Sequence, residues 1–176
     1  LLIDADLRRP GLHGLFGARG EIGLADALAG EIDLLSALQP VTAGRGEIAG
    51  LSLLSAGAPP EDPAELLTSP RLGELLERAR QEFDFVLIDT PPLLAVSDPC
   101  TIAPQVDGLL LVVRLEKTRH EALERSVELL RRHYAPVLGV VVNGVTGDAG
   151  FYGDGYGDAS LRDELRATPR QPAMAT

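Results

Sequence analysis

Three aspartates follow short apolar runs, and their spacing suits a shared metal site. Asp4 and Asp6 close the stretch "LLIDAD", and Asp89 closes the stretch "FVLID". Side chains two residues apart on an extended strand point the same way, and neighbouring strands lie about 4.8 Å apart. If the two runs form adjacent strands, the three carboxylates share one crevice and repel one another. A hard cation such as Mg²⁺ relieves that repulsion, so the pattern predicts a magnesium site.

Neighbouring residues indicate that the cation would act together with a phosphate. Arg8 and Arg9 follow directly, and guanidinium groups match phosphate oxygens. For any single aspartate the alternative is a carboxylate that only caps the loop after its strand. Thr90, next to Asp89, either supports the nucleotide and metal site or is an ordinary turn residue.

The elements that would position these residues alternate along the chain. Apolar runs predict strands at residues 1–3, 85–88, 109–113 and 137–142, with a weaker candidate at 51–54. Their continuous apolarity is typical of strands covered on both faces. Helix signals lie between them: the segment 23–29 before Gly30, Asp62-Pro63, Ser69-Pro70, and a capping box from Thr118 to Glu121. Alternating strands and helices predict an α/β fold with a doubly wound, mostly parallel sheet.

Composition bounds the domain organisation and the partners. The 176 residues suffice for one domain with a core, and the net charge of −10 argues against nucleic-acid binding. No run reaches the roughly 18 apolar residues of a membrane span. From Thr146 onward glycine and aspartate dominate, so we expect a folded domain over residues 1–145 and a flexible tail over residues 146–176.

At these motifs the chain resembles a known family. "LLIDADLRRPGLHGLFG" is similar to the Walker A′ segment of the bacterial tyrosine kinases of capsule and exopolysaccharide synthesis, and "FDFVLIDTPPLLAVSDP" is similar to their Walker B segment. "GLADALAG", "VDGLLLVVR" and "APVLGVVVNGV" follow in the family's order, so the resemblance covers roughly residues 1–145. "DTPP" alone would indicate only the wider P-loop ATPase superfamily with deviant Walker motifs, of the MinD/ParA type, whereas "DADLRRP" narrows the resemblance to the kinases.

The resemblance implies a non-specific protein-tyrosine kinase that uses ATP and Mg²⁺ and transfers the γ-phosphoryl group to tyrosine. It implies that Asp4 helps to hold Mg²⁺ through water and that Asp89 is the Walker B magnesium ligand. Asp6 would approach the tyrosine hydroxyl as a base or positioning group, and Arg8 would assist at the phosphates. Asn143, at the end of the last predicted strand, either reads adenine or has a structural turn role.

Family members carry phosphoacceptor tyrosines in a C-terminal cluster, which a neighbouring subunit phosphorylates. Here "FYGDGYG" offers Tyr152 and Tyr156, and the alternative is a tail with incidental tyrosines. The resemblance also implies a homo-oligomer, working in the cytoplasm at the inner face of the membrane. Its partner would be a membrane-embedded polysaccharide co-polymerase or activator domain, either fused or separate.

One family feature is missing from the sequence. No GxxxxGK[ST] loop occurs among the 176 residues, and the family places that loop upstream of the A′ segment. The resemblance therefore implies an N-terminally truncated kinase domain without the first P-loop strand and helix. We expect a gap in the sheet beside the Asp89 strand, no autokinase activity in isolation, and ready aggregation.

Two other readings of the sequence remain. The first is a catalytically inactive regulatory module without a P-loop. The second is a MinD/ParA-type partition ATPase, which needs a basic or amphipathic C-terminal surface that this acidic, glycine-rich tail does not offer.

Overall fold

The computed structural model describes residues 1–43 and 46–145. The predicted tail at residues 146–176, with Tyr152 and Tyr156, lies outside the described residues. Among the helices that are described, none is both long and apolar enough to cross a membrane.

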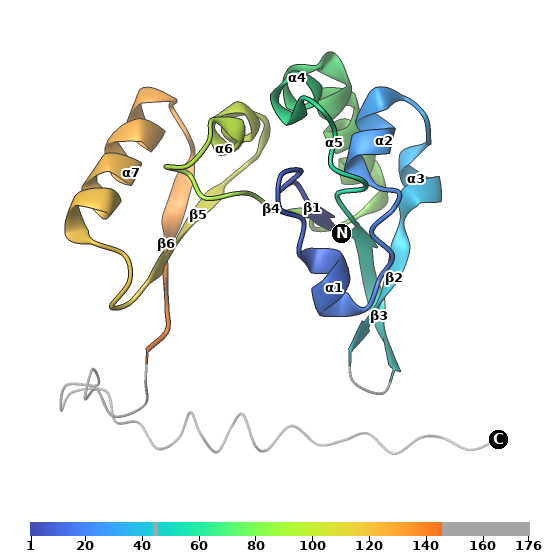
Figure 1. Ribbon diagram of the computed structural model, residues 1–176, viewed down its shortest axis with the longest axis horizontal. Helices are drawn as coiled ribbons and strands as arrows, with labels where there is room; N and C mark the ends of the chain where they lie inside the picture. Colours follow the sequence, from blue (N-terminus) through green and yellow to red (C-terminus); the bar gives the residue numbers. More distant parts are fainter. Residues whose placement is uncertain (44–45, 146–176) are drawn as a thin grey trace.

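The described chain alternates strands and helices around two small sheets (Figure 1). Strands β2, β3, β1 and β4 form one sheet in that order, and β5 and β6 form the other. Every strand pair is parallel except β2 with β3, which confirms the predicted α/β fold with mostly parallel strands. In chain order the elements are β1 (Leu2–Asp4), α1 (Leu12–Phe16), α2 (Leu24–Ala29), α3 (Leu34–Ala37), β2 (Gln39–Ala43), β3 (Gly46–Leu54), α4 (Pro63–Thr68), α5 (Pro70–Glu82), β4 (Leu87–Asp89), α6 (Asp98–Ile102), the 3₁₀ turn η1 (Ala103–Gln105), β5 (Leu109–Arg114), α7 (His120–Arg132) and β6 (Val137–Asn143).

Local signals predict most helix ends correctly. The Asp62 carboxylate accepts a hydrogen bond from the Glu65 N–H at 3.0 Å and caps α4. Gly30 ends α2 in the left-handed conformation, with φ 82°, which glycine adopts without a steric penalty. The capping box predicted at Thr118 is wrong: α7 begins after Arg119, and the Thr118 hydroxyl instead accepts the Arg114 N–H at 2.9 Å. This hydrogen bond joins the last residue of β5 to the segment just before α7, and it therefore stabilises the turn between them.

Sequence patterning misses the short helices α1, α3 and α6 and the hairpin of β2 and β3. The weak candidate at 51–54 is the end of a nine-residue strand that pairs antiparallel with β2. Pro40 interrupts the pattern of β2, and the pairing register shifts between Pro40 and Thr42. Proline cannot donate to a ladder and is found on edge strands, which is where β2 lies.

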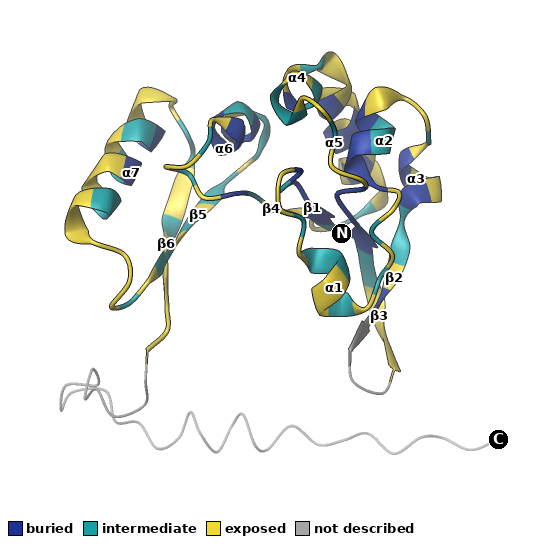
Figure 2. Ribbon diagram, in the orientation of Figure 1, coloured by how far each residue is buried: buried dark blue, intermediate teal, exposed yellow. Residues whose placement is uncertain are grey.

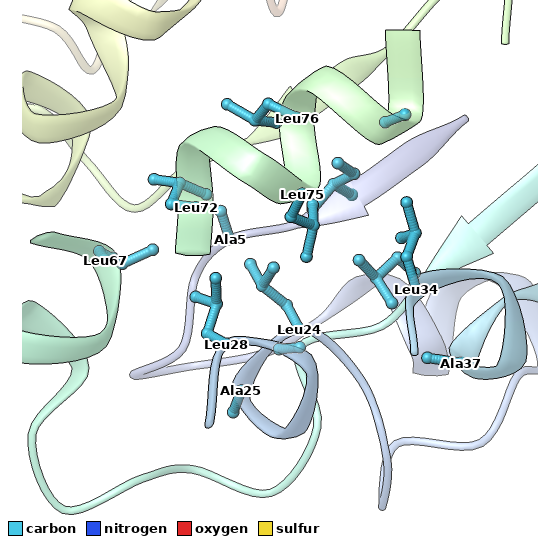
Figure 3. Packing of buried hydrophobic residues seen from close by; sticks show 14 of the residues in the cluster. Ala5, Leu24, Ala25, Leu28, Leu34, Ala37, Leu67, Leu72, Leu75 and Leu76 are labelled. Atoms are coloured by element: carbon cyan, nitrogen blue, oxygen red, sulfur yellow. The ribbon is translucent and has the colours of Figure 1, made fainter. Parts of the chain in front are cut away.

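The hydrophobic core lies between the four-stranded sheet and helices α2 to α5. Leu24 and Leu28 of α2 point toward Leu72 and Leu75 of α5, with Ala5 beside them (Figure 3). The predicted apolar face of α5 is buried at all four positions, which are Leu72, Leu75, Leu76 and Ala79. Amphipathic spacing at i, i+3, i+4 and i+7 therefore predicts the packing of α5 correctly.

The second sheet is much more exposed, which corrects the expectation that its strands are covered on both faces (Figure 2). Leu110 and Val112 of β5 are 57% and 63% exposed, and they alternate with half-buried neighbours. Helix α7 lies beside this sheet (Figure 1). The other face of β5 is open because the described residues supply no layer against it.

The predicted gap beside the Asp89 strand is present. Within residues 1–43 and 46–145, β4 and β5 each end a sheet, and no strand joins them. A cavity of about 670 Å³ lies there, bordered by Phe85 and Leu87 on one side and by Leu110 and Val112 on the other. Each strand presents an unpaired row of backbone N–H and C=O groups, the usual template for another strand.

Candidate metal and nucleotide site

The pairing of β1 with β4 brings the two aspartate motifs together. The parallel register matches Leu2 with Leu87 and Asp4 with Asp89. The Ala5 N–H donates to the Asp89 carbonyl at 2.8 Å and continues the ladder past both aspartates. The condition set in the sequence analysis is thus met: the two runs form adjacent strands, and the aspartates lie at the carboxyl ends of parallel strands, where open α/β sheets bind their ligands.

Asp4 is fully buried, and its carboxylate organises the loop that follows β1. Oδ1 accepts the Asp6 N–H at 3.2 Å, and Oδ2 accepts the N–H groups of Gly11 and Leu12 at 3.1 and 3.0 Å. This is the capping role considered as the alternative for a strand-end aspartate. Its predicted action on Mg²⁺ through water remains a prediction.

Asp6 lies in the same loop and is half-buried. Its Oδ1 accepts the N–H groups of Arg8 and Arg9 at 3.1 and 2.9 Å, an Asx turn that ties the carboxylate to its own loop. The orientation of the Asp6 side chain therefore depends on the path of residues 6–9.

Asp89 is exposed at the end of β4, and its environment favours a cation. Partial burial, followed by the negative charges of Asp4 and Asp6, raises the pKa of Asp89, although a hydrogen bond from the Thr90 backbone opposes the change. No group of three or more His, Cys, Asp or Glu side chains in the described residues is arranged to hold a metal. A cation here would bind one or two carboxylates together with phosphate and water, which is the manner of Mg²⁺.

Arg8 forms an ion pair that the sequence does not predict, and its predicted role at the phosphates stays a prediction. Its Nε and Nη2 donate to the two oxygens of Asp98 at 2.9 and 3.1 Å, the bidentate geometry of a guanidinium on a carboxylate. The Asp98 side chain is fully buried, whereas that of Arg8 is 38% exposed. Asp98 is the residue that sequence reasoning misses: as the first residue of α6 it looks like an ordinary acid at a helix start.

Thr90 and Asn143 lie apart from one another. Thr90 is half-buried and borders the cavity between β4 and β5. Asn143 ends β6 in the two-stranded sheet, and its Oδ1 accepts the Gly144 N–H at 2.7 Å, as in a structural turn. The predicted contact of Asn143 with adenine stays a prediction.

Fold and site together define a class: an α/β protein with mostly parallel strands and an acidic crevice at their carboxyl ends. No family model matches the chain. The tyrosine-protein kinase Wzc of Salmonella typhi is 38% identical over 157 residues, which is 89% of this chain and 21% of Wzc.

Solved structures of kinase domains are also similar to this chain. The kinase domain of Escherichia coli tyrosine kinase Etk superposes with a TM-score of 0.77 at 36% identity, over 84% of this chain and 56% of that domain. The VpsO kinase domain superposes at 0.75 with 34% identity, over 82% of this chain and 70% of that domain. The chain belongs to the bacterial tyrosine kinase family of the Wzc and Etk type, as a homologue of its kinase domain. It spans about a fifth of the length of the curated relatives.

A more distant likeness concerns the fold alone. A plasmid partition protein from Borrelia burgdorferi superposes with a TM-score of 0.58 at 16% identity. The fold is therefore shared by kinases and partition proteins, and the kinase family is separated from the latter by sequence.

Proposed function

We propose that this chain is the catalytic portion of a protein-tyrosine autokinase that uses Mg-ATP and regulates capsular or exopolysaccharide synthesis and export. The observation that carries the proposal is the β1–β4 register, which sets Asp4 beside Asp89 and leaves Asp6 close enough to raise the pKa of Asp89. Membership of the tyrosine kinase family supports it.

Each acidic residue has a role in this proposal. Asp89 is the magnesium ligand, since it is the exposed carboxylate at the end of its strand. Asp4 acts through water and holds the loop, and Asp6 orients the tyrosine hydroxyl or accepts its proton. Mg²⁺, when bound, neutralises phosphate charge as the γ-phosphoryl group is transferred. Tyr152 and Tyr156 are the proposed acceptors, and Asn143 the proposed adenine contact.

The proposal includes a strand that residues 1–43 and 46–145 do not supply. The unpaired edges of β4 and β5 face one apolar cavity, and the related kinase domains are longer than this chain. A further strand from the intact protein would satisfy both edges and would bring the phosphate-binding loop with its lysine to the crevice. On that basis the 176 residues alone have no kinase activity and aggregate readily.

The partners and the cellular location of the intact protein are proposed from its similarity to these kinases. The intact protein would act as a homo-oligomer in the cytoplasm at the inner face of the membrane. A membrane-embedded polysaccharide co-polymerase or activator domain, fused or separate, would be its partner.

Phosphotyrosine analysis tests the proposal. The intact protein, incubated with Mg-ATP, should gain phosphotyrosine, and Asp89→Asn should lose most of the signal, whereas Glu74→Gln on the exposed side of α5 should not. Asp-N cleavage before Asp148 separates Tyr152 and Tyr156 from the rest of the domain for mass spectrometry. An unphosphorylated intact protein would overturn the kinase assignment.

A second candidate is a regulatory module that has lost catalysis. The favouring observation is that no GxxxxGK[ST] loop occurs in the 176 residues, while Asp4 is occupied by backbone N–H groups. An intact protein that binds a kinase or polymerase partner but retains no Mg-ATP would support this candidate.

A further inference from the structure

The ion pair of Arg8 with Asp98 joins two segments that are far apart in sequence. Ninety residues separate them, one in the loop after β1 and the other at the start of α6. Asp98 is fully buried, and both of its oxygens accept from Arg8. A buried carboxylate is stable only when it is paired and hydrogen-bonded, so this contact constrains both segments.

The loop that Arg8 belongs to is held at three points. Asp4 binds its two ends through the N–H groups of Asp6, Gly11 and Leu12. Asp6 binds the N–H groups of Arg8 and Arg9. Asp98 supplies the third point, and unlike Asp4 and Asp6 it comes from a segment ninety residues further along the chain.

We infer that Asp98 is a positioning residue: through Arg8 it sets the orientation of the Asp6 carboxylate for phosphoryl transfer. This inference rests on the proposed function. Arg8 acts here by fixing the loop instead of by touching a phosphate, because the Nε and Nη2 edge of its guanidinium is bound to the Asp98 carboxylate. Small misplacements of reacting groups cost about 10²-fold in rate, so the loss of this anchor is expected to lower kcat.

The test compares variants of the intact protein by steady-state kinetics. Asp98→Asn removes the charge and keeps the shape, and we expect kcat to fall about tenfold to 10²-fold. The KM for Mg-ATP should change less than about threefold, because no phosphate contact is removed. Glu74→Gln is the matched acid-to-amide control, at an exposed position of α5, and should leave both parameters unchanged.

The partner residue gives a second set of variants. Arg8→Ala should match Asp98→Asn, and the double variant should be no slower than either, since the two residues act as a unit. Arg8→Lys keeps the charge but loses the fork, so it should show an intermediate kcat in a protein that still melts cooperatively. Effects that multiply in the double variant, or an Arg8→Ala variant that raises only KM, would overturn the inference in favour of a direct phosphate contact.

Hydrogen exchange supplies a readout that separates positioning from mere stability. In Asp98→Asn the amides of residues 6–9, 11 and 12 should exchange faster, while those of β3 and α5 keep their protection. Lowered kcat with unchanged protection of the loop would contradict the inference. An active wild type with an unaffected Asp98→Asn variant overturns this inference alone, whereas an inactive wild-type protein overturns the proposed function with it.

Discussion

The two sheets of this molecule are built from similar apolar strands, yet they differ sharply in burial. Ile3 of β1 and Leu54 of β3 are almost completely buried in the core cluster that includes residues of α2 to α5. Leu110 and Val112 of β5 and Leu138 of β6 are more than half exposed. The difference shows that a continuous apolar run predicts a strand but not its burial. Whether the strand is buried depends on the helices and strands that pack against it.

A charge placed in the cavity gives the strongest test of that difference. Val112→Asp, made in the intact protein, should cost about 3–5 kcal/mol if the cavity is filled there, because the carboxylate would be buried without a partner. Urea unfolding measures the change. Val145→Asp is the control, at a site 52% exposed just beyond β6, and should cost less than about 0.5 kcal/mol. Equal costs at the two sites would show that the cavity stays open to water.

A truncation in the first region tests the buried side of the comparison. Leu24 is completely buried between α2 and α5, so Leu24→Ala should cost about 2–5 kcal/mol through lost burial and the cavity left behind. Leu15→Ala removes the same atoms at a residue 74% exposed on α1 and should change the free energy of unfolding little. Thermal and urea unfolding measure both variants. Equal losses in the free energy of unfolding would show that Leu24 is not part of a buried core.

The acidic crevice belongs to the first region and predicts a pH-dependent effect. Because the pKa of Asp89 is raised, the folded state holds that proton more tightly than the unfolded chain does. Its ionisation therefore lowers stability at neutral pH, and this loss disappears below about pH 4. Asp89→Asn should stabilise the protein at pH 7, without Mg²⁺ or nucleotide, by less than about 1 kcal/mol because solvent screens the exposed carboxyl.

Melting curves from pH 4 to pH 8 measure this effect. Glu74→Gln, an exposed acid on α5, should show no such pH-dependent gain. A stabilisation by Asp89→Asn that is the same at pH 4 and pH 7 would contradict the ionised Asp89 carboxylate, disfavoured by partial burial and by the charges of Asp4 and Asp6, as its cause.

The smallest effect is expected in the second region, at the end of α7. Tyr134 has a left-handed backbone, with φ 51°, and a side chain that is 93% exposed. Glycine is preferred at such positions, so Tyr134→Gly should raise stability by a few tenths to about 1 kcal/mol after its entropic cost. Tyr134→Ala keeps the Cβ and should bring no gain, and thermal unfolding distinguishes the two.

Local patterns along the chain determined much of the fold and part of the site. The apolar spacing of α5, the Asp62 cap and the Gly30 stop each depend on residues within one or two turns, and each was predictable. The position of Asp4 and Asp89 at one edge of the sheet was predictable as well, because parallel strands align their carboxyl ends, whereas their adjacency was a condition that the β1–β4 pairing meets. The β2 strand was missed because a proline hid its pattern.

Only the tertiary structure decided which of these groups are buried and what they bind. The pairing of Arg8 with Asp98, the enclosure of Asp4 by its loop and the open face of β5 all depend on segments far apart in the chain. Burial and hydrogen-bond partners are properties of packing, since the same carboxylate is a ligand, a cap or an anchor according to what surrounds it. The sequence alone thus determined the elements and the chemistry available, and packing determined how that chemistry is used.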